Sequence, residues 1–428
     1  MRLARKIRQG SSRSSPLQLI RLRGGVGMKT PAVMIGSRFG VIGSNLLTGV
    51  VLARAMPVDT RGVFATLITV PGLIAMLLTA GLDSATLRLS GRDEDRSTAV
   101  QAALRRGMQS IAVPALGVLF LAFGPGEYFE HSALAWAMGM CAVPLLVSNQ
   151  LLGNCAIGAN DARVWARATV ANAVTYLLLA AGVLAAQVPS LEAFLACFLM
   201  ANAVCLGILL RWLLKARPRE RLASKKSLRM LRKTALGTAA PTIAQLAIMR
   251  IPIPLMAALA GTDQVGILAI ALPFAESLLI VPVMVASYLL PRYHAETPKG
   301  SMVHRHASIV FAATVVFGSM VAFLAPLLLP RIYGDNYEGA VKLVVILLPG
   351  IAVFSYTRIV QSHLYATGRY VAVTAASVAG LGISVLIQVS TVPRLGAVGG
   401  ALGITLGYCV ATAVIGLTYH YNRPRVTA

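Results

Sequence analysis

The sequence predicts an all-α polytopic membrane protein with about 12 transmembrane helices, arranged as two six-helix pseudo-repeat bundles around a central cleft. Three observations lead to this prediction. Hydrophobic residues make up 57% of the chain and charged residues only 13%, and the mean hydropathy is +0.73. Apolar windows of about 20 residues recur along the chain. A basic stretch near the middle, Arg211–Lys233, separates these windows into two equal groups.

The basic stretch predicts the orientation of the chain in the membrane. It contains ten Lys and Arg residues and one acid, Glu220. Short loops rich in Lys and Arg stay on the cytoplasmic side of a membrane. The net charge of +24 therefore indicates loops between spans. It does not indicate nucleic-acid binding, for which stacking aromatics among the cations would be expected.

The first 30 residues carry eight Lys and Arg and no acid, which favours a cytoplasmic tail, with an organellar transit peptide as the alternative. The apolar windows then predict twelve spans: 33–55, 63–86, 108–126, 132–155, 166–187, 191–214, 235–260, 265–290, 307–329, 340–366, 370–391 and 399–421. The predicted domains are a basic tail (1–32), an N-terminal six-helix lobe (33–214), a basic cytoplasmic linker (215–234), a C-terminal six-helix lobe (235–421) and a second cytoplasmic tail (422–428).

The distribution of cations supports twelve spans with both termini in the cytoplasm. In this topology 31 of the 39 Lys and Arg residues lie on the cytoplasmic side, and three lie within spans. The five on the outer side are Arg54, Arg61, Arg331, Lys342 and Arg394.

Two short repeats indicate that the halves are duplicated. The segment Asp59–Ala65 is repeated at Asp263–Ala269, and Ala156–Gly158 is repeated at Ala366–Gly368. The offsets, about 204 and 210 residues, are nearly equal. Because each half crosses the membrane an even number of times, the repeat is parallel, with its axis along the membrane normal.

Small residues at a spacing of four predict close helix packing in the first and last spans. The residues are Gly36, Gly40, Gly399, Gly403 and Gly407.

Four segments are similar to motifs of a known transporter family: Leu52–Ala65, Tyr333–Tyr337, Ala366–Arg369 and Pro393–Ala401. Together they resemble the polysaccharide-transport branch of the multidrug/oligosaccharidyl-lipid/polysaccharide (MOP) exporter superfamily. The resemblance implies a MATE-like flippase for lipid-linked oligosaccharides, with two six-helix lobes around a cationic cleft. Relatives often carry an Asp-Arg pair in the seventh span, where this chain has Pro252 and Ile253.

Charged residues inside spans are costly and are therefore candidates for function. Arg38, Arg250 and Arg358 are the candidate diphosphate ligands, because guanidinium groups bind phosphate oxygens in pairs of hydrogen bonds. Such arginines would form a ladder into the cleft. Arg38 and Arg358 also lie near enough to the interface to reach headgroups.

Two acids are candidates for ion coupling or ion pairing, Glu276 and Asp83. Glu276 and Arg250 are predicted at similar depth on neighbouring helices, so a purely structural ion pair is the alternative to a ligand site. Pro252 and Pro254 are expected to break the helix that follows Arg250.

No catalytic signature, metal site or cofactor motif is found in the sequence. The cysteines lie in apolar runs and are predicted to be packing residues. The histidines His294, His304 and His306 are interpreted as part of a solvated basic loop.

These observations predict a non-enzymatic flippase of the bacterial inner membrane. It would move a polyprenyl-diphosphate-linked oligosaccharide from the cytoplasmic to the outer leaflet by alternating access. Its partners would be the lipid-linked oligosaccharide, membrane lipids, and the polymerase and glycosyltransferases of the same pathway. One alternative is an ion-coupled multidrug exporter of the same fold, although a cationic substrate favours acids in the cleft. A membrane-embedded glycosyltransferase or ligase is a second alternative, disfavoured by the short outer loops.

Overall fold

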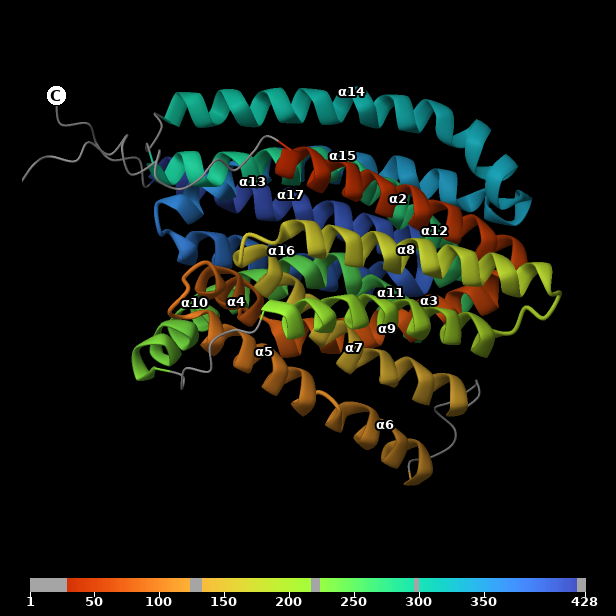
Figure 1. Cartoon of the computed structure of the whole chain (residues 1–428). Coiled ribbons are helices and arrows are strands. Elements are labelled where there is room, and N and C mark those ends of the chain that lie inside the picture. Colours follow the sequence, from red (N-terminus) through yellow and green to blue (C-terminus); the bar gives the residue numbers. More distant parts are fainter. Residues whose placement is uncertain (1–28, 124–132, 217–223, 296–299, 422–428) are drawn as a thin grey trace, which may run out of the picture.

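The computed structural model describes residues 29–123, 133–216, 224–295 and 300–421, which are helical nearly throughout and contain no strand (Figure 1). The helices of the N-terminal half are α2 (Lys29–Ala55), α3 (Val58–Thr79), α4 (Leu82–Ser90), α5 (Arg96–Gln109), α6 (Ala112–Phe123), α7 (Ala133–Gly158), α8 (Ala162–Ala185) and α9 (Leu191–Ala216). Those of the C-terminal half are α10 (Lys225–Arg250), α11 (Pro252–Ala260), α12 (Thr262–Ser277), α13 (Ile280–Ala295), α14 (Gly300–Tyr333), α15 (Gly339–Ala366), α16 (Tyr370–Leu395) and α17 (Ala397–Tyr421).

Ten of the twelve predicted spans coincide with helices that are long and apolar enough to cross a membrane. Eight are single helices, namely α3, α7, α8, α9, α14, α15, α16 and α17. Two are bent pairs, α10 with α11 and α12 with α13. The other predicted spans, 33–55 and 108–126, correspond to α2 and α6, which do not pass the same test within the described residues. The prediction of a multi-pass, all-helical membrane protein is confirmed.

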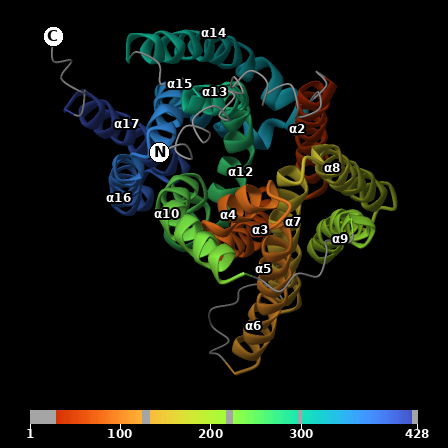
Figure 2. The same cartoon turned by 60° about the vertical axis from the view of Figure 1, so that its left-hand side comes forward.

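Both halves use the same packing pattern. In the N-terminal half α2 packs on α8, α8 on α9, α9 on α7, and α7 on α3 to α6. In the C-terminal half α10 packs on α16, α16 on α17, α17 on α15, and α15 on α12 to α14. Figure 2 shows the two groups of helices on opposite sides of the molecule, with α3, α4, α10 and α12 between them. The repeated pairs confirm the predicted duplication into two six-helix bundles.

The break predicted after Arg250 is present. Helix α10 ends at Arg250, Pro252 starts α11, and the two helices are bent by 42°. Proline lacks the N–H that would continue the helical hydrogen bonds, and its ring displaces the preceding turn. A second break of 42° separates α12 from α13, close to Glu276. The Arg250 and Glu276 side chains therefore both lie next to helix breaks.

The first repeated motif forms a very close contact between the halves. Helices α3 and α12 cross so tightly that a Cβ atom at Gly62 would lie 1.7 Å from the carbonyl oxygen of Thr262. A Cβ atom at Gly266 would lie 2.1 Å from the carbonyl oxygen of Val58. Val58 and Thr262 are equivalent in the repeat, as are Gly62 and Gly266. We call these four residues the glycine crossing, a two-fold contact made by two copies of one motif.

The halves also touch at the end of the bundle where Figure 1 labels α4 and α10. Gly81, between α3 and α4, has a left-handed backbone with φ of +74°, and a Cβ atom there would lie 1.9 Å from the carbonyl oxygen of Ala235 in α10. Only glycine satisfies both the backbone angle and this close approach. The halves are therefore in contact at two separate levels of α3 and α4.

The other glycine predictions have mixed outcomes. In α17, Cβ atoms at Gly399, Gly403 and Gly407 would come within 3 Å of α16, so the predicted tight packing is confirmed there. The prediction for Gly36 and Gly40 is wrong, because added Cβ atoms would meet nothing within 4 Å. A GxxxG spacing places two glycines on one helix face, but whether a partner lies opposite that face depends on the fold.

The predicted linker 215–234 is partly helical. Helix α9 continues to Ala216, and α10 begins at Lys225 with Ser224 as its N-cap. The Ser224 hydroxyl accepts a hydrogen bond from the Lys226 N–H at 3.2 Å. Residues 217–223 of the linker, and residues 1–28 and 422–428 of the predicted tails, lie outside the described residues.

The glycine crossing leads to a prediction for stability. We expect Gly62→Ala to destabilise the protein by about 1–3 kcal/mol, because the new methyl group forces α3 and α12 apart. Thermal unfolding of the purified protein measures the loss. Gly382→Ala in α16 is the matched control, since its methyl group meets nothing within 4 Å. Equal unfolding temperatures for the two variants would show that α3 and α12 can move apart at the glycine crossing without loss of stability.

Candidate substrate-binding site

A cavity of about 280 Å³ lies between the two halves, directly beside the glycine crossing. Helices α2, α3 and α8 line it from the N-terminal half, and α10, α12 and α14 from the C-terminal half. We call it the central cavity. Its polar lining residues are Asn45, Thr48, Arg61, Tyr176, Arg250, Glu276 and Tyr333.

Arg61 is the unexpected member of this site. The sequence analysis placed it in an outer loop, and this placement is wrong, because α3 already begins at Val58 and turns Arg61 inward. The side chain is 8% exposed, and its Nε has no hydrogen-bond partner. Its guanidinium lies over the Phe64 ring at 5.5 Å from the centroid. No ion pair to Arg61 is formed within the described part of the chain.

A buried guanidinium without a carboxylate partner is energetically unfavourable unless another group supplies its charge compensation. The neighbours of Arg61 in the cavity offer hydroxyl dipoles, namely Tyr176 and Tyr333, but no negative charge close enough to pair with it. The Tyr176 hydroxyl itself has no hydrogen-bond partner. This corner of the central cavity therefore has the charge and the hydrogen-bond donors to accept an anion.

Arg250 and Glu276 lie side by side in the wall of the same cavity. The Arg250 Nη2 lies 3.3 Å from the Glu276 Oε2, so the ion pair considered in the sequence analysis is formed. The Arg250 side chain is 46% exposed and that of Glu276 22% exposed. The Glu276 Oε1 has no hydrogen-bond partner. The pair thus lies in the wall of an open cavity, and its charges are not sealed within packed helices.

The structure does not bring Arg38 and Arg358 into the central cavity. The Arg38 guanidinium lies over the Trp165 ring of α8, 4.6 Å from the centroid. Arg358 donates a hydrogen bond to Gln245 Oε1 at 2.8 Å and lies over the Phe354 ring at 4.9 Å. Each arginine packs within its own half. The predicted ladder of three arginines is therefore not formed in this conformation.

Asp83 is also separate from the central cavity. It begins α4, and its Oδ1 accepts a hydrogen bond from the Ser84 N–H at 2.7 Å. No ion pair to Asp83 occurs among the residues that the structure describes. The Asp83 side chain lines a second cavity, which lies inside the N-terminal half.

The interpretation of the histidines as a loop cluster is wrong, because His294 belongs to α13, and His304 and His306 belong to α14. Hydrogen bonds join His306 Nδ1 to the Tyr293 hydroxyl, at 2.9 Å, and His304 Nδ1 to the Tyr356 hydroxyl. In residues 29–123, 133–216, 224–295 and 300–421, no group of three His, Cys, Asp or Glu side chains is placed to hold a metal ion.

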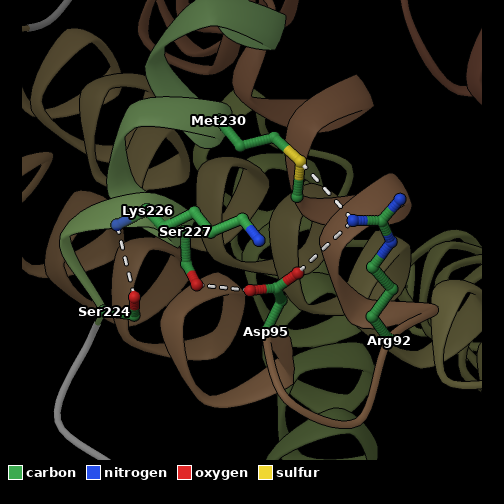
Figure 3. Close-up of polar contacts among 6 residues, drawn as sticks. All are labelled: Arg92, Asp95, Ser224, Lys226, Ser227 and Met230. Carbon is green, nitrogen blue, oxygen red and sulfur yellow. Dashed lines mark hydrogen bonds and ion pairs between the residues drawn. The ribbon is translucent and has the colours of Figure 1, made fainter. Parts of the chain in front are cut away.

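A polar contact joins the halves at the same end as Gly81 (Figure 3). Asp95, before α5, accepts a hydrogen bond from the Ser227 hydroxyl of α10. Arg92 lies 3.9 Å from the Asp95 carboxylate and 3.7 Å from the Met230 sulfur. Asp95 and Ser227 are both buried. We call Arg92, Asp95, Ser227 and Met230 the polar latch.

Comparison with solved structures identifies the fold. The lipid II flippase MurJ, in an inward closed conformation, is similar with a TM-score of 0.75 and 11% identity, over 91% of this chain and 87% of MurJ. This chain shares the fold of MurJ. A MATE-family multidrug resistance transporter of the MOP superfamily, in an inward-facing conformation, has a TM-score of 0.69 and 15% identity, with coverage of 91% and 97%. A mutant of the Vibrio cholerae MATE transporter VcmN has a TM-score of 0.67 and 12% identity, with coverage of 92% and 95%.

No family model and no curated protein matches the sequence of this chain. The shared fold confirms the predicted MATE-like arrangement of two lobes around a cleft. These neighbours are described as a multidrug resistance transporter and a lipid II flippase. The polysaccharide-transport branch stays a prediction.

The exposure of the Arg250–Glu276 pair leads to a second prediction. We expect Arg250→Gln and Glu276→Gln each to change the free energy of unfolding by about 1 kcal/mol or less, because partly solvated ion pairs contribute little. Thermal unfolding of both single variants and of the double variant measures this. A loss of about 3 kcal/mol in the single variants, restored in the double variant, would instead identify a buried structural pair.

The polar latch leads to a third prediction. We expect Asp95→Ala to leave the Ser227 hydroxyl without its acceptor. The closed conformation of this end should lose about 1 kcal/mol, so that the population of molecules open at this end rises roughly fivefold. The measurement is the rate at which a membrane-impermeant thiol reagent modifies a single cysteine at Asn45, in a cysteine-free background and in inside-out vesicles. Asp93→Ala is the matched control, since Asp93 is 93% exposed and its ion pair among the described residues is with Arg96 of the same half. Equal rates in the two variants would mean that the latch does not hold this end closed.

Proposed function

We propose that this protein is a flippase that moves a polyprenyl-diphosphate-linked oligosaccharide from the cytoplasmic to the outer leaflet of a bacterial inner membrane. The observation that carries the proposal is the pair of arginines in the central cavity. Arg61 comes from the N-terminal half and Arg250 from the C-terminal half, with Glu276 as the single opposing carboxylate. The lining of the cavity therefore carries one net positive charge.

Guanidinium groups suit a diphosphate for physical reasons. They stay charged when they are desolvated, and each donates two parallel hydrogen bonds to phosphate oxygens. Arg61 has no competing anion, whereas Arg250 must be shared with Glu276. A diphosphate that reaches Arg250 competes with the carboxylate for the same guanidinium. Ligand binding is thereby coupled to the charge state of Glu276.

Alternating access follows from the two contacts between the halves. With the polar latch and the Gly81 contact open, the central cavity would be reached from the cytoplasm. With the glycine crossing open, it would be reached from the outer side. A ligand bound by one arginine from each half would draw the halves together around it, while the lipid chain remains in the bilayer. In this proposal both termini are cytoplasmic, the tails and linker have the predicted boundaries, and the polymerase and glycosyltransferases of the pathway are the partners.

A multidrug exporter is the second candidate function. The Glu276 Oε1 has no hydrogen-bond partner, and the rings of Phe64, Tyr176 and Tyr333 line the same cavity. A carboxylate among aromatic rings suits a lipophilic cation. Two similar structures are MATE transporters, one of which is described as a multidrug resistance transporter. The unpaired Arg61 opposes a cation and favours the flippase.

The experiment that tests the proposal uses the purified protein in proteoliposomes. The probe is a fluorescent polyprenyl diphosphate that carries an oligosaccharide, and its movement is followed by the loss of fluorescence to a membrane-impermeant quencher. We expect Arg61→Met to reduce the rate at least about tenfold, because one bidentate, charge-assisted contact contributes about 1.5–3 kcal/mol. The fold should persist, since no ion pair is lost.

Arg394→Met is the matched control, because Arg394 is exposed near the end of α16 and lines neither the central cavity nor the second cavity. Uptake of ethidium driven by an ion gradient, with no movement of the diphosphate probe, would replace the flippase by the multidrug exporter. Full transport by the double variant Arg250→Gln/Glu276→Gln would mean that Arg250 does not bind the diphosphate and that the ion pair is only structural.

A further inference from the structure

The second cavity lies wholly within the N-terminal half and has a volume of about 500 Å³. Helices α2, α3, α4, α7, α8 and α9 contribute to its wall. Six of its lining residues carry carboxamide side chains, so we call it the amide cavity. These residues are Asn45, Asn149, Gln150, Asn154, Asn172 and Asn202.

The carboxamides come from four different helices. Within one helix, the spacing of the residues places their side chains on the face that lines the cavity. On α7, Asn149 and Gln150 share a face with Asn154, one turn later. On α8, Asn172 follows Trp165 after two turns. Apart from the adjacent pair Asn149 and Gln150, these residues are separated in the sequence, and helix packing brings the four helices together.

Most of the carboxamides have unused hydrogen-bonding capacity. Asn202 donates to the Phe198 carbonyl at 2.9 Å, and Asn149 donates to the Asn202 carbonyl at 3.0 Å. The Asn149 Oδ1 is buried without a partner. Hydrogen bonds from the remaining four carboxamide side chains to other described residues are absent.

Asn45 and Gln150 are exposed, and Asn154 and Asn172 are half-buried, so these side chains are open to the cavity. An amide in a membrane-spanning bundle needs a hydrogen-bond partner, which lipid does not supply. A structural role would require them to bond with one another, and only Asn149 and Asn202 do so. The others face an open volume of a size that suits small-molecule sites. The cavity must therefore hold water or a ligand that both donates and accepts hydrogen bonds.

The side chains of the cavity restrict the chemistry of that ligand. A carboxamide presents one acceptor and two donors, which matches hydroxyl groups, since these also donate and accept. The only charged lining residue is Asp83. Trp165 adds a flat apolar wall, and its indole contacts both the Arg38 guanidinium and Gly153, where a Cβ atom would lie 2.5 Å from the ring. Hydrogen-bonding groups around an apolar plane suit uncharged sugar rings.

The amide cavity adjoins the central cavity. Asn45 of α2 lines both the amide cavity and the central cavity. A ligand with an anionic group at Arg61 and Arg250 would therefore extend its neighbouring groups past Asn45 into the amide cavity. Along the path from the central cavity to the amide cavity, the lining residues suit first a diphosphate and then hydroxyl-rich groups.

We propose that the amide cavity binds the first, uncharged sugar residues of the lipid-linked oligosaccharide while the diphosphate is held in the central cavity. This inference rests on the proposed flippase function and adds the part of the site that recognises the glycan. Gln150 and Asn172 are specificity-determining residues in this assignment. Their replacement costs no hydrogen bond to another described residue, so the variants should fold.

The test measures binding by calorimetry with the full-length protein in nanodiscs. The probes are farnesyl diphosphate and farnesyl diphosphate linked to one N-acetylglucosamine. We expect the glycosylated probe to bind the wild type more tightly than the bare probe. In Gln150→Met/Asn172→Leu this advantage should fall at least about tenfold, the equivalent of one or two neutral hydrogen bonds, while binding of the bare probe is unchanged. Gln101→Met, at an exposed position of α5, is the matched control.

The two proposals can fail separately. Bare-probe binding that is insensitive to Arg61→Met would refute the diphosphate site, and titration with free methyl glycosides would still test the amide cavity by itself. Equal affinity of the wild type for both farnesyl probes would overturn the glycan assignment. A heat of Na⁺ binding that disappears in Gln150→Met/Asn172→Leu, without any effect of sugars, would also overturn it and assign the carboxamides to a cation.

Discussion

The glycine crossing is the contact on which the rest of the structure depends. Gly62 and Gly266 let the backbones of α3 and α12 touch. Gly62 faces the Thr262 carbonyl and Gly266 faces the equivalent carbonyl of Val58. Because the two copies of one motif meet, the contact is symmetric and needs no other element. It also places Arg61, the neighbour of Gly62, inside the protein. One small-residue contact thus joins the halves and buries the cation of the central cavity.

The polar groups of the interior are divided by charge. Arg61 and Arg250 make the central cavity cationic, whereas carboxamides make the amide cavity nearly neutral. Asn45 belongs to both cavities. Such a division suits a ligand that is anionic at one end and hydroxylated at the other, which is the chemistry of a sugar diphosphate.

The sequence predicted the candidate site only in part. Arg250, Glu276 and the break at Pro252 were found because charges and prolines within apolar windows are costly and therefore conspicuous. Arg61 was missed because the apolar window begins after it, although the helix begins earlier. The carboxamides were missed because they carry no charge. Their helical spacing on α7 and α8 was nevertheless visible in the sequence.

The helical, membrane-spanning architecture could be predicted from the sequence, since composition and the length of apolar windows are local properties set by the bilayer. The two halves could be predicted from the short repeats. Which polar residues meet could be learned only from the folded structure. Arg38 and Arg358 are as conspicuous in the sequence as Arg250, yet each packs within its own half. The rotation and crossing of helices far apart in the chain determine those contacts, and no local pattern of residues contains that information.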